Sequence, residues 1–392
     1  MNQNDNKFLP DDFDRIYNKY FKKLKESNTL RYDPSGWLNT ISIASKHYSF
    51  DNKISGHPIV PYYSDYNEQL GMYKEKIGGL LNKWDNYQFT FQEFTLCSSV
   101  TLGSYVILSA LFRKNIQTVI FETPAFYASI NQAKSLGMKS YLLPTYSNDN
   151  FSIKENFNEW RHADPFILWL TQPRMSLGLN QDPNFIFDLY KKLPDDSYMV
   201  IDEASEQLFP SRLNKFTPSE FPRIIKVRSF FKGMGINGIR LSFISHHASL
   251  REDMQRELEN IQGAVDYFSL LNTLTYAEES EKFKLMLSIA NDQTTSLRKS
   301  IQREFATESI VPSNLENGYV GSIGLNLSKF TFPYRTNREN LLKHCFTHGI
   351  SVIIGATMKF AFEDQKEFIR INYFKPYDEI SAALQVISTY IK

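Results

Sequence analysis

The middle of the chain alternates short apolar runs with longer amphipathic ones. The short runs, at residues 118–121 (TVIF), 166–170 (FILWL), 198–201 (YMVI) and 224–227 (IIKV), are rich in β-branched and aromatic residues. Runs of this kind, bounded by turn residues, are typical of parallel strands that are buried on both faces. Residues 102–111 and 128–135 have the longer apolar spacing of helices. The pattern therefore predicts βαβ units and an α/β fold.

The pattern changes in the second half of the chain. Residues 250–261 and 277–305 predict long helices with charged outer faces, and we expect the second to connect a large domain to a smaller one. From residue 318 onward strands and helices return, and the chain ends in a predicted helix at residues 377–391. A chain of 392 residues with 42% hydrophobic content can bury the cores of two domains.

Charge and cysteine content exclude several classes of protein. The net charge is +1 and no long basic block is present, so a nucleic-acid partner is not expected. The first residues are polar, and no apolar run is long enough to span a bilayer, so we expect a soluble, cytoplasmic protein. Cys97 and Cys345 lie in no metal-binding spacing with histidine, and no metal site is predicted.

The segment at residues 229–240, SFFKGMGINGIR, carries the strongest chemical signal. It places Lys232 alone in a glycine-rich turn between Ser229 and Arg240. A lysine amine forms an imine with an aldehyde, and a hydroxyl and a guanidinium can together hold a phosphate. Pyridoxal phosphate carries both groups. The alternative is a solvated turn, because any lysine before a glycine-rich stretch gives a similar motif.

A second signal is Asp202, which directly follows the apolar run at residues 198–201. A carboxylate at the end of a buried strand is costly unless a cation faces it. A helix N-cap is the competing interpretation, since aspartate is favoured there. Glu203 points to the opposite side of an extended chain, so it is not a candidate for this site.

Together these segments resemble the fold-type I, class I/II aminotransferase family. The resemblance implies an aminotransferase-like fold, with a large domain built on a mixed, mostly parallel sheet flanked by helices and a smaller α/β domain. It places the large cofactor-binding domain at residues 61–285 and the small domain at residues 286–392, with residues 1–60 packing against the latter. It also implies that Lys232 forms the imine with pyridoxal phosphate. Asp202 would pair with the pyridine nitrogen and keep the ring an electron sink.

Further segments match the family's cofactor contacts. Ser99, Val100 and Thr101, in LCSSVT, resemble the phosphate loop at a helix N-terminus, although they also read as an ordinary helix cap. Phe126 falls where an aromatic ring covers the cofactor, although a phenylalanine is more often part of a core. Ser205 stands where the family usually has a tyrosine that binds the ring.

Two more positions extend the resemblance to the partner subunit and the substrate. Tyr66 matches a tyrosine that reaches the phosphate of the neighbouring subunit, which implies a homodimer. Arg370, in EFIRINYF, resembles the arginine that clamps the substrate carboxylate, preceded by a strand at residues 349–355. A structural arginine in an exposed strand is the alternative for Arg370.

The departures from the family pattern limit the inferred reaction. Aligned on Pro173 and Gly178, the family's second asparagine becomes Met175, and Ser205 replaces the tyrosine. An aminotransferase acting on an amino acid and a 2-oxo acid is the first prediction. A lyase or cyclase of specialised amino-acid metabolism is the alternative. A non-catalytic sensor or regulator is the third hypothesis, but the roughly sixty residues before Tyr66 leave no room for a DNA-binding module.

Overall fold

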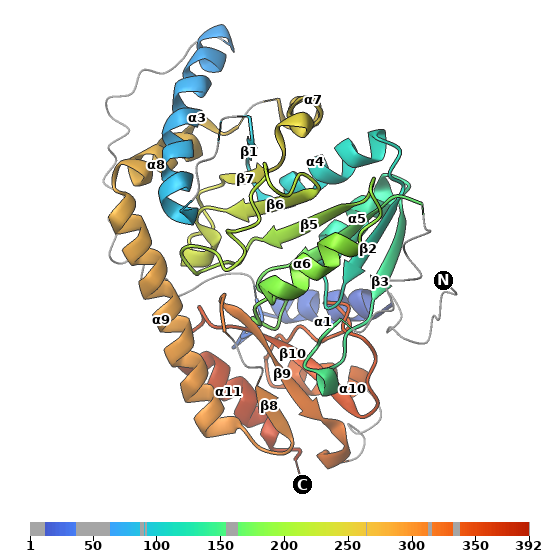
Figure 1. The fold of residues 1–392 in the computed structure, drawn as a ribbon. Helices are drawn as coiled ribbons and strands as arrows, with labels where there is room; N and C mark the ends of the chain where they lie inside the picture. Colours follow the sequence, from blue (N-terminus) through green and yellow to red (C-terminus); the bar gives the residue numbers. More distant parts are fainter. Residues whose placement is uncertain are drawn as a thin grey trace.

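A computed structural model describes residues 12–36, 63–86, 90, 92–153, 164–263, 265–312, 316–331 and 338–391. Across these residues the chain forms a seven-stranded sheet and a three-stranded sheet, each with its own helices (Figure 1). The strands of the larger sheet are β1 (Phe94–Cys97), β2 (Thr118–Glu122), β3 (Lys139–Leu143), β4 (Phe166–Thr171), β5 (Tyr198–Glu203), β6 (Ile224–Ser229) and β7 (Ser242–Ser245).

The larger sheet is mixed and mostly parallel, as predicted. Its order is β1-β7-β6-β5-β4-β2-β3, and the four predicted apolar runs form the adjacent strands β2, β4, β5 and β6. The strands from β3 to β6 pair in parallel, whereas β7 is antiparallel to both β1 and β6. The pattern did not reveal β1, β3 or β7, because β1 and β7 have four residues each and β3 is only partly buried.

Both faces of the larger sheet are covered. Alternate residues of β4 belong to different cores, with Ile167 and Trp169 facing one and Leu168 and Leu170 facing the other. The first core is completed by α4 (Val100–Arg113), α5 (Tyr127–Ser135) and α7 (Arg251–Gln262). The second is completed by α6 (Pro183–Lys192). Burial on both faces explains why these strands read as continuous apolar runs.

The helix α9 (Ser280–Phe305) joins the two sheets. Its first turns place Phe283 and Met286 in a core shared with α3 (Tyr63–Asp85) and α8 (Tyr267–Glu278), whereas Ile301 belongs to the core of the smaller sheet. The helix predicted at residues 277–305 is confirmed as α9, but it begins three residues later, at Ser280. The backbone of Glu279 is not helical (φ −104°, ψ 47°) and separates α8 from α9. The prediction therefore assigned the end of α8 to the helix that follows it.

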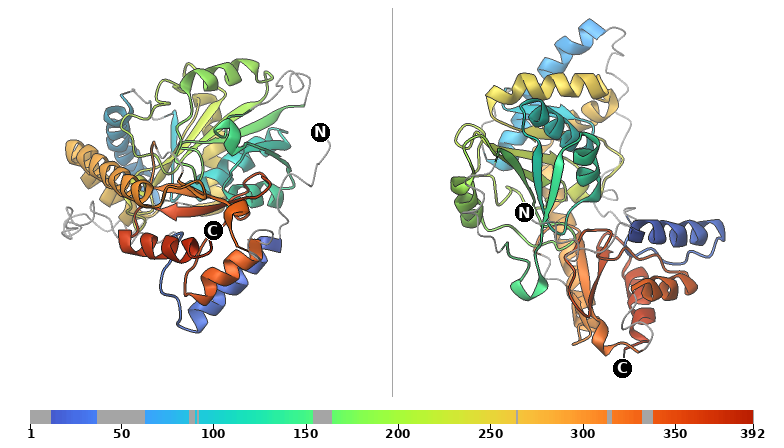
Figure 2. Two further views of the ribbon diagram at one scale, coloured as in Figure 1. Left: turned by 90° about the horizontal axis from the view of Figure 1, so that it is seen from below. Right: turned by 90° about the vertical axis from the view of Figure 1, so that its right-hand side faces the viewer.

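The smaller sheet has the antiparallel order β10-β9-β8, with β8 (Ile310–Pro312), β9 (Val320–Asn326) and β10 (Lys366–Asn372). Helices α10 (Arg338–Thr347) and α11 (Tyr377–Ser388) pack beside it, and α1 (Asp12–Glu26) lies along α10 (Figure 2). The strand expected at residues 349–355 is not formed. That segment makes only isolated bridges, Tyr32 with Ile350 and Ile354 with Ile369.

The segment that follows α1 packs against the smaller sheet. The backbone N–H of Asn372 in β10 donates to the carbonyl of Pro34 at 2.9 Å. The domain boundaries at residues 60 and 285 stay predictions, and position 285 lies within α9. Of the helices in the described ranges, none combines the length and the apolar character needed to cross a membrane.

Candidate active site

Two adjoining cavities open where the parallel strands end. The inner cavity, of about 30 Å³, is lined by Val100, Thr101, Phe126, Thr171, Pro173, Arg174, Met175, Ser176, Asp202, Ala204, Ser205, Lys232 and Val320. The outer cavity, of about 270 Å³, is lined by Ser98, Ser99, Val100, Thr101, Phe126, Tyr127, Ser229, Lys232, Ile236, Asn237, Ile239, Arg240, Leu241 and Ser242. Lys232 is among the residues that line both cavities.

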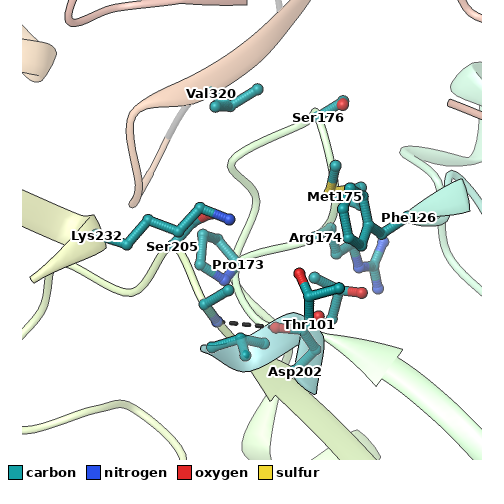
Figure 3. Close-up of a pocket in the computed structure, with 13 residues that line it drawn as sticks. Thr101, Phe126, Pro173, Arg174, Met175, Ser176, Asp202, Ser205, Lys232 and Val320 are labelled. Atoms are coloured by element: carbon teal, nitrogen blue, oxygen red, sulfur yellow. Dashed lines mark hydrogen bonds between the residues drawn. The ribbon is translucent and has the colours of Figure 1, made fainter. Parts of the chain in front are cut away.

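Lys232 begins a single turn of 3-10 helix after β6. Its backbone N–H donates to Ser229 Oγ at 3.2 Å. Figure 3 shows its side chain reaching into the inner cavity from one side, with Phe126 and Met175 on the other. Burial lowers the pKa of the Lys232 amine; the Asp202 carboxylate opposes this shift, and the charges of Arg370 and Arg240 add to it. The amine is therefore neutral, and nucleophilic, over a wider pH range than a surface lysine.

Asp202 is the second buried charge of the inner cavity. It stands near the end of β5 with 4% of its surface exposed, and its Oδ1 accepts the backbone N–H of Ala204 at 2.9 Å. The residues after it form a turn, so the helix N-cap interpretation does not apply. Burial raises the pKa of the Asp202 carboxyl, and the Lys232 charge partly opposes that shift. Glu203 points away, as expected, and accepts a hydrogen bond from Ser211 Oγ at 2.8 Å.

The first turn of α4 forms one wall of the outer cavity. Ser99 is its N-cap, and the side chain accepts the backbone N–H of Leu102 at 3.1 Å. The capping interpretation of Ser99 is therefore correct, and it is compatible with an anion at the same helix end. Val100 and Thr101 follow and line both cavities.

The opposite wall of the outer cavity carries Ser229 and Arg240. Arg240 is exposed, and its backbone N–H donates to Ser269 Oγ at 3.0 Å, which fixes the loop before β7. Phe126 precedes α5 and lines both cavities instead of the core behind them. The sequence-predicted residues from three separate segments thus meet around one space.

Met175 and Ser205 both line the inner cavity. Met175 also packs against an apolar cluster that includes Leu177 and Phe368. Of these two side chains only Ser205 can donate a hydrogen bond, and Arg174 and Ser176 on either side of Met175 also line the cavity.

Arg370 lies in β10 and is 1% exposed. Its Nε donates to the carbonyl oxygen of Ser35 at 2.8 Å, and Nη2 donates to the same oxygen. It is not among the described residues that line either cavity, although its charge contributes to lowering the pKa of Lys232. The alternative of an arginine in an exposed strand does not hold, because both the strand and the side chain are buried.

Tyr66 lies in α3, but its side chain is outside the described residues. Some cavity residues were not predicted, among them Pro173, Arg174, Tyr127 and Val320. Arg174 and Pro173 directly follow β4, so the rule that ligands bind at strand ends could have identified them. Val320 begins β9 of the smaller sheet, and no local signal links it to the cavity.

Comparison with known proteins gives partial matches in sequence. A search against protein-family models finds no match. A histidinol-phosphate aminotransferase of Oleidesulfovibrio alaskensis is 26% identical over 156 residues, which are 38% of this chain and 40% of that protein. A second one, from Buchnera aphidicola subsp. Diuraphis noxia, is 22% identical over 146 residues, 36% of this chain and 39% of that protein. The chain thus covers about two fifths of the length of these relatives.

Solved structures match nearly the whole chain. An aspartate aminotransferase from Thermotoga maritima superposes with a TM-score of 0.75 at 12% identity, covering 97% of both chains. This chain has the type I aminotransferase fold. A double mutant of the Thermus thermophilus aspartate aminotransferase gives 0.74 at 13% identity over 97% of both chains. The methionine aminotransferase YbdL of Escherichia coli gives 0.73 at 14% identity, covering 95% of this chain and 96% of that one.

In this type I fold the two cavities fit the chemistry of pyridoxal phosphate. The inner cavity offers a buried carboxylate for a cationic ring nitrogen, and the shared wall offers an amine for an aldehyde. The outer cavity offers hydroxyls, a helix N-terminus and an exposed guanidinium for a phosphate. Lys232, which lines both cavities, lies between the carboxylate of the inner cavity and the hydroxyls and guanidinium of the outer one.

Proposed function

We propose that this chain is a pyridoxal-phosphate-dependent aminotransferase that acts on an amino acid. One observation carries the proposal: the half-buried Lys232 and the buried Asp202 line a single cavity, and this cavity adjoins a second one lined by hydroxyls and Arg240. A half-buried lysine and a buried carboxylate cost stability, and a folded protein keeps such a pair where the pair has chemistry to perform. We further propose that the protein works in the cytoplasm as a homodimer.

Pyridoxal phosphate, when bound, supplies an aldehyde that captures amines and a ring that withdraws electrons from the neighbouring carbon. Asp202 would hold the ring nitrogen in its protonated form. Phe126 would cover one face of the ring. Ser229, Arg240 and the N-terminus of α4, with Ser99 and Thr101, would hold the phosphate.

Lys232 is the residue that moves the proton. Its lowered pKa leaves more of the amine neutral than in a surface lysine, which suits it both to bind the aldehyde and to act as a base. Displaced from the aldehyde by an incoming amino acid, it would take the proton from the substrate α-carbon. Its turn follows β6, so the amine stays close to the cavity while it is free.

We infer that Arg370 holds the substrate carboxylate. Its guanidinium is buried beside the Ser35 carbonyl and electrostatically coupled to Lys232, so the bound carboxylate would lie near the catalytic amine. The proposal gives this chain the reaction class of its sequence relatives, but not the substrate that their names state. The sequence matches span only 38% and 36% of this chain.

A lyase or cyclase is the second candidate, and Met175 and Ser205 favour it. These residues stand in place of the asparagine and tyrosine that contact the cofactor's phenolic oxygen in the family, and both line the inner cavity. The two candidates share every residue role up to removal of the α-proton. They differ in whether the amino group stays on the cofactor.

A single-turnover experiment separates the two candidates. The protein, loaded with pyridoxal phosphate, is mixed with a panel of amino acids and no 2-oxo acid, and the cofactor is then extracted. Conversion to pyridoxamine phosphate in step with one equivalent of 2-oxo acid supports the aminotransferase. Multiple turnovers to an eliminated or cyclic product with the aldehyde retained support the lyase or cyclase. A protein that binds no pyridoxal phosphate would contradict both.

A further inference from the structure

The turn that carries Lys232 is held by neighbouring segments as well as by its own hydrogen bonds. It closes at Gly235, whose φ of +76° favours glycine. At Gly233 a Cβ atom would lie 2.2 Å from the carbonyl oxygen of Glu206, so no side chain fits there. The segment around Glu206 therefore packs directly against the lysine turn.

Gln207 binds this turn with its side chain. Its Nε2 donates to the carbonyl oxygen of Gly233 at 2.6 Å, and the residue is 2% exposed. A carbonyl only accepts, so the orientation of the amide is fixed with Nε2 toward Gly233. Its Oε1 then lies 3.2 Å from the hydroxyl of Thr294, which is fully buried in α9.

The backbone of Gln207 continues the connection to the smaller sheet. Its N–H donates to Asn317 Oδ1 at 3.0 Å, and Asn317 Nδ2 in turn donates to Glu206. Asn317 is 1% exposed and lies shortly before β9, whose first residue, Val320, lines the inner cavity. Gln207 thus links the lysine turn to α9 and to the strand that brings the small domain to the cavity.

We propose that Gln207 is a positioning residue for Lys232: its amide fixes the turn so that the amine faces the inner cavity, and its backbone couples this turn to the small domain. The inference rests on the proposed function, because it assigns Lys232 the chemical role. Gly233 has a buried carbonyl that Gln207 satisfies. Without that donor, the turn would relax toward another partner, and the amine would leave its productive position.

The test compares wild type, Gln207→Met and Gln207→Glu in the full chain. Methionine keeps the length of the side chain and removes both polar atoms. Glutamate keeps the acceptor for Thr294 and donates to Gly233 only when protonated. Gln255→Met is the matched control, because Gln255 is half-buried in α7, where its Nε2 donates to Glu259 Oε1 at 2.9 Å. Lys232 reactivity is read in cofactor-free protein from its rate of trapping by pyridoxal and cyanoborohydride, with exposed lysines of the same sample as internal reference.

We expect Gln207→Met to slow trapping at Lys232 about tenfold relative to the exposed lysines, with no change in Gln255→Met. Gln207→Glu should approach the wild-type rate only on the acidic side of the pH profile. In loaded enzyme, kcat should fall while KM stays close to the wild-type value. Trapping at Lys232 equal to that of wild type in Gln207→Met would overturn the inference.

If Gln207→Met fails to fold, the same trapping measurement on Thr294→Val tests the inference. It keeps the volume of the side chain and removes only the hydroxyl that faces the amide. We expect slower trapping at Lys232 in this variant, and a wild-type rate would overturn the inference. Failure of the proposed function looks different: there wild-type Lys232 would itself react no faster than the exposed lysines.

Discussion

At the scale of single residues, the site depends on two charges that burial alone would neutralise. Burial lowers the pKa of Lys232 and raises that of Asp202, and each charge opposes the shift of the other. The pair therefore keeps an ammonium and a carboxylate closer to their charged states than either residue could alone. The charges of Arg370 and Arg240 act in the opposite direction and lower the pKa of the Lys232 amine.

We predict that Asp202→Asn lowers the pKa of Lys232 in cofactor-free protein. The asparagine keeps the acceptor for Ala204 and removes the negative charge that raises the lysine pKa. Trapping at Lys232, measured across pH, should therefore reach its half-maximal rate at a lower pH than in wild type. Glu203→Gln is the control, since Glu203 is equally buried but bonds Ser211 on the other side of the strand. A midpoint that rises in Asp202→Asn would contradict the account.

At the scale of elements, the position of helix α4 sets where the proposed phosphate-binding residues lie. Gly103 lets the helix approach β6 and β1 closely: an added Cβ would lie 2.9 Å from Val227 Cγ2 and 3.0 Å from Cys97 Sγ. The same close approach sets where Ser99 and Thr101 meet the outer cavity. Packing under the helix therefore determines the position of the phosphate donors.

Gly103→Ala should destabilise the fold by ~1–3 kcal/mol, because the methyl group overpacks the helix on the sheet. Gly79→Ala in α3 is the matched control, because a Cβ there meets nothing within 4 Å. That change should stabilise the protein by ~0.5–1 kcal/mol through helix propensity. Urea denaturation midpoints measure both effects. Equal midpoints for the two variants would show that α4 is not packed as closely as described.

The parallel core and the reactive residues at its strand ends could be predicted from the sequence. Strands β2, β4, β5 and β6 are buried on both faces, so they read as apolar runs. Asp202 lies near the end of β5, and Lys232 follows β6. The start of α9 was predicted three residues too early, because apolar spacing locates a helix but not its exact first residue. The contribution of Val320 could not be predicted, because it depends on how one sheet is placed against the other. The cofactor and substrate contacts expected of the remaining site residues stay predictions. These residues are Ser99, Phe126, Ser229, Arg240 and Arg370.

At the scale of the whole molecule, α9 and the lysine turn connect the two sheets into one site. The inner cavity takes Val320 from the smaller sheet and Asp202 from the larger one. Movement of the small domain would therefore alter the cavity directly, through β9, and the lysine turn indirectly, through Asn317 and Gln207.

The proposed homodimer has a specific test at this scale. If Tyr66 completes the partner's site, co-expressed Lys232→Ala and Tyr66→Ala chains form mixed dimers with one fully intact site. Random pairing then restores about a quarter of the wild-type activity. If Tyr66 serves its own chain, or if the protein is a monomer, both sites of every pair carry a defect and no activity returns.

The account depends most on the bond between Lys232 and the cofactor aldehyde. The direct measurement is to add pyridoxal phosphate to the full chain, record the visible spectrum, reduce with borohydride, and identify the labelled peptide by mass spectrometry. We predict one labelled lysine per chain, at position 232, and the loss of both the visible band and the label in Lys232→Ala. Labelling spread over surface lysines, or a visible band that Lys232→Ala leaves unchanged, would contradict the account.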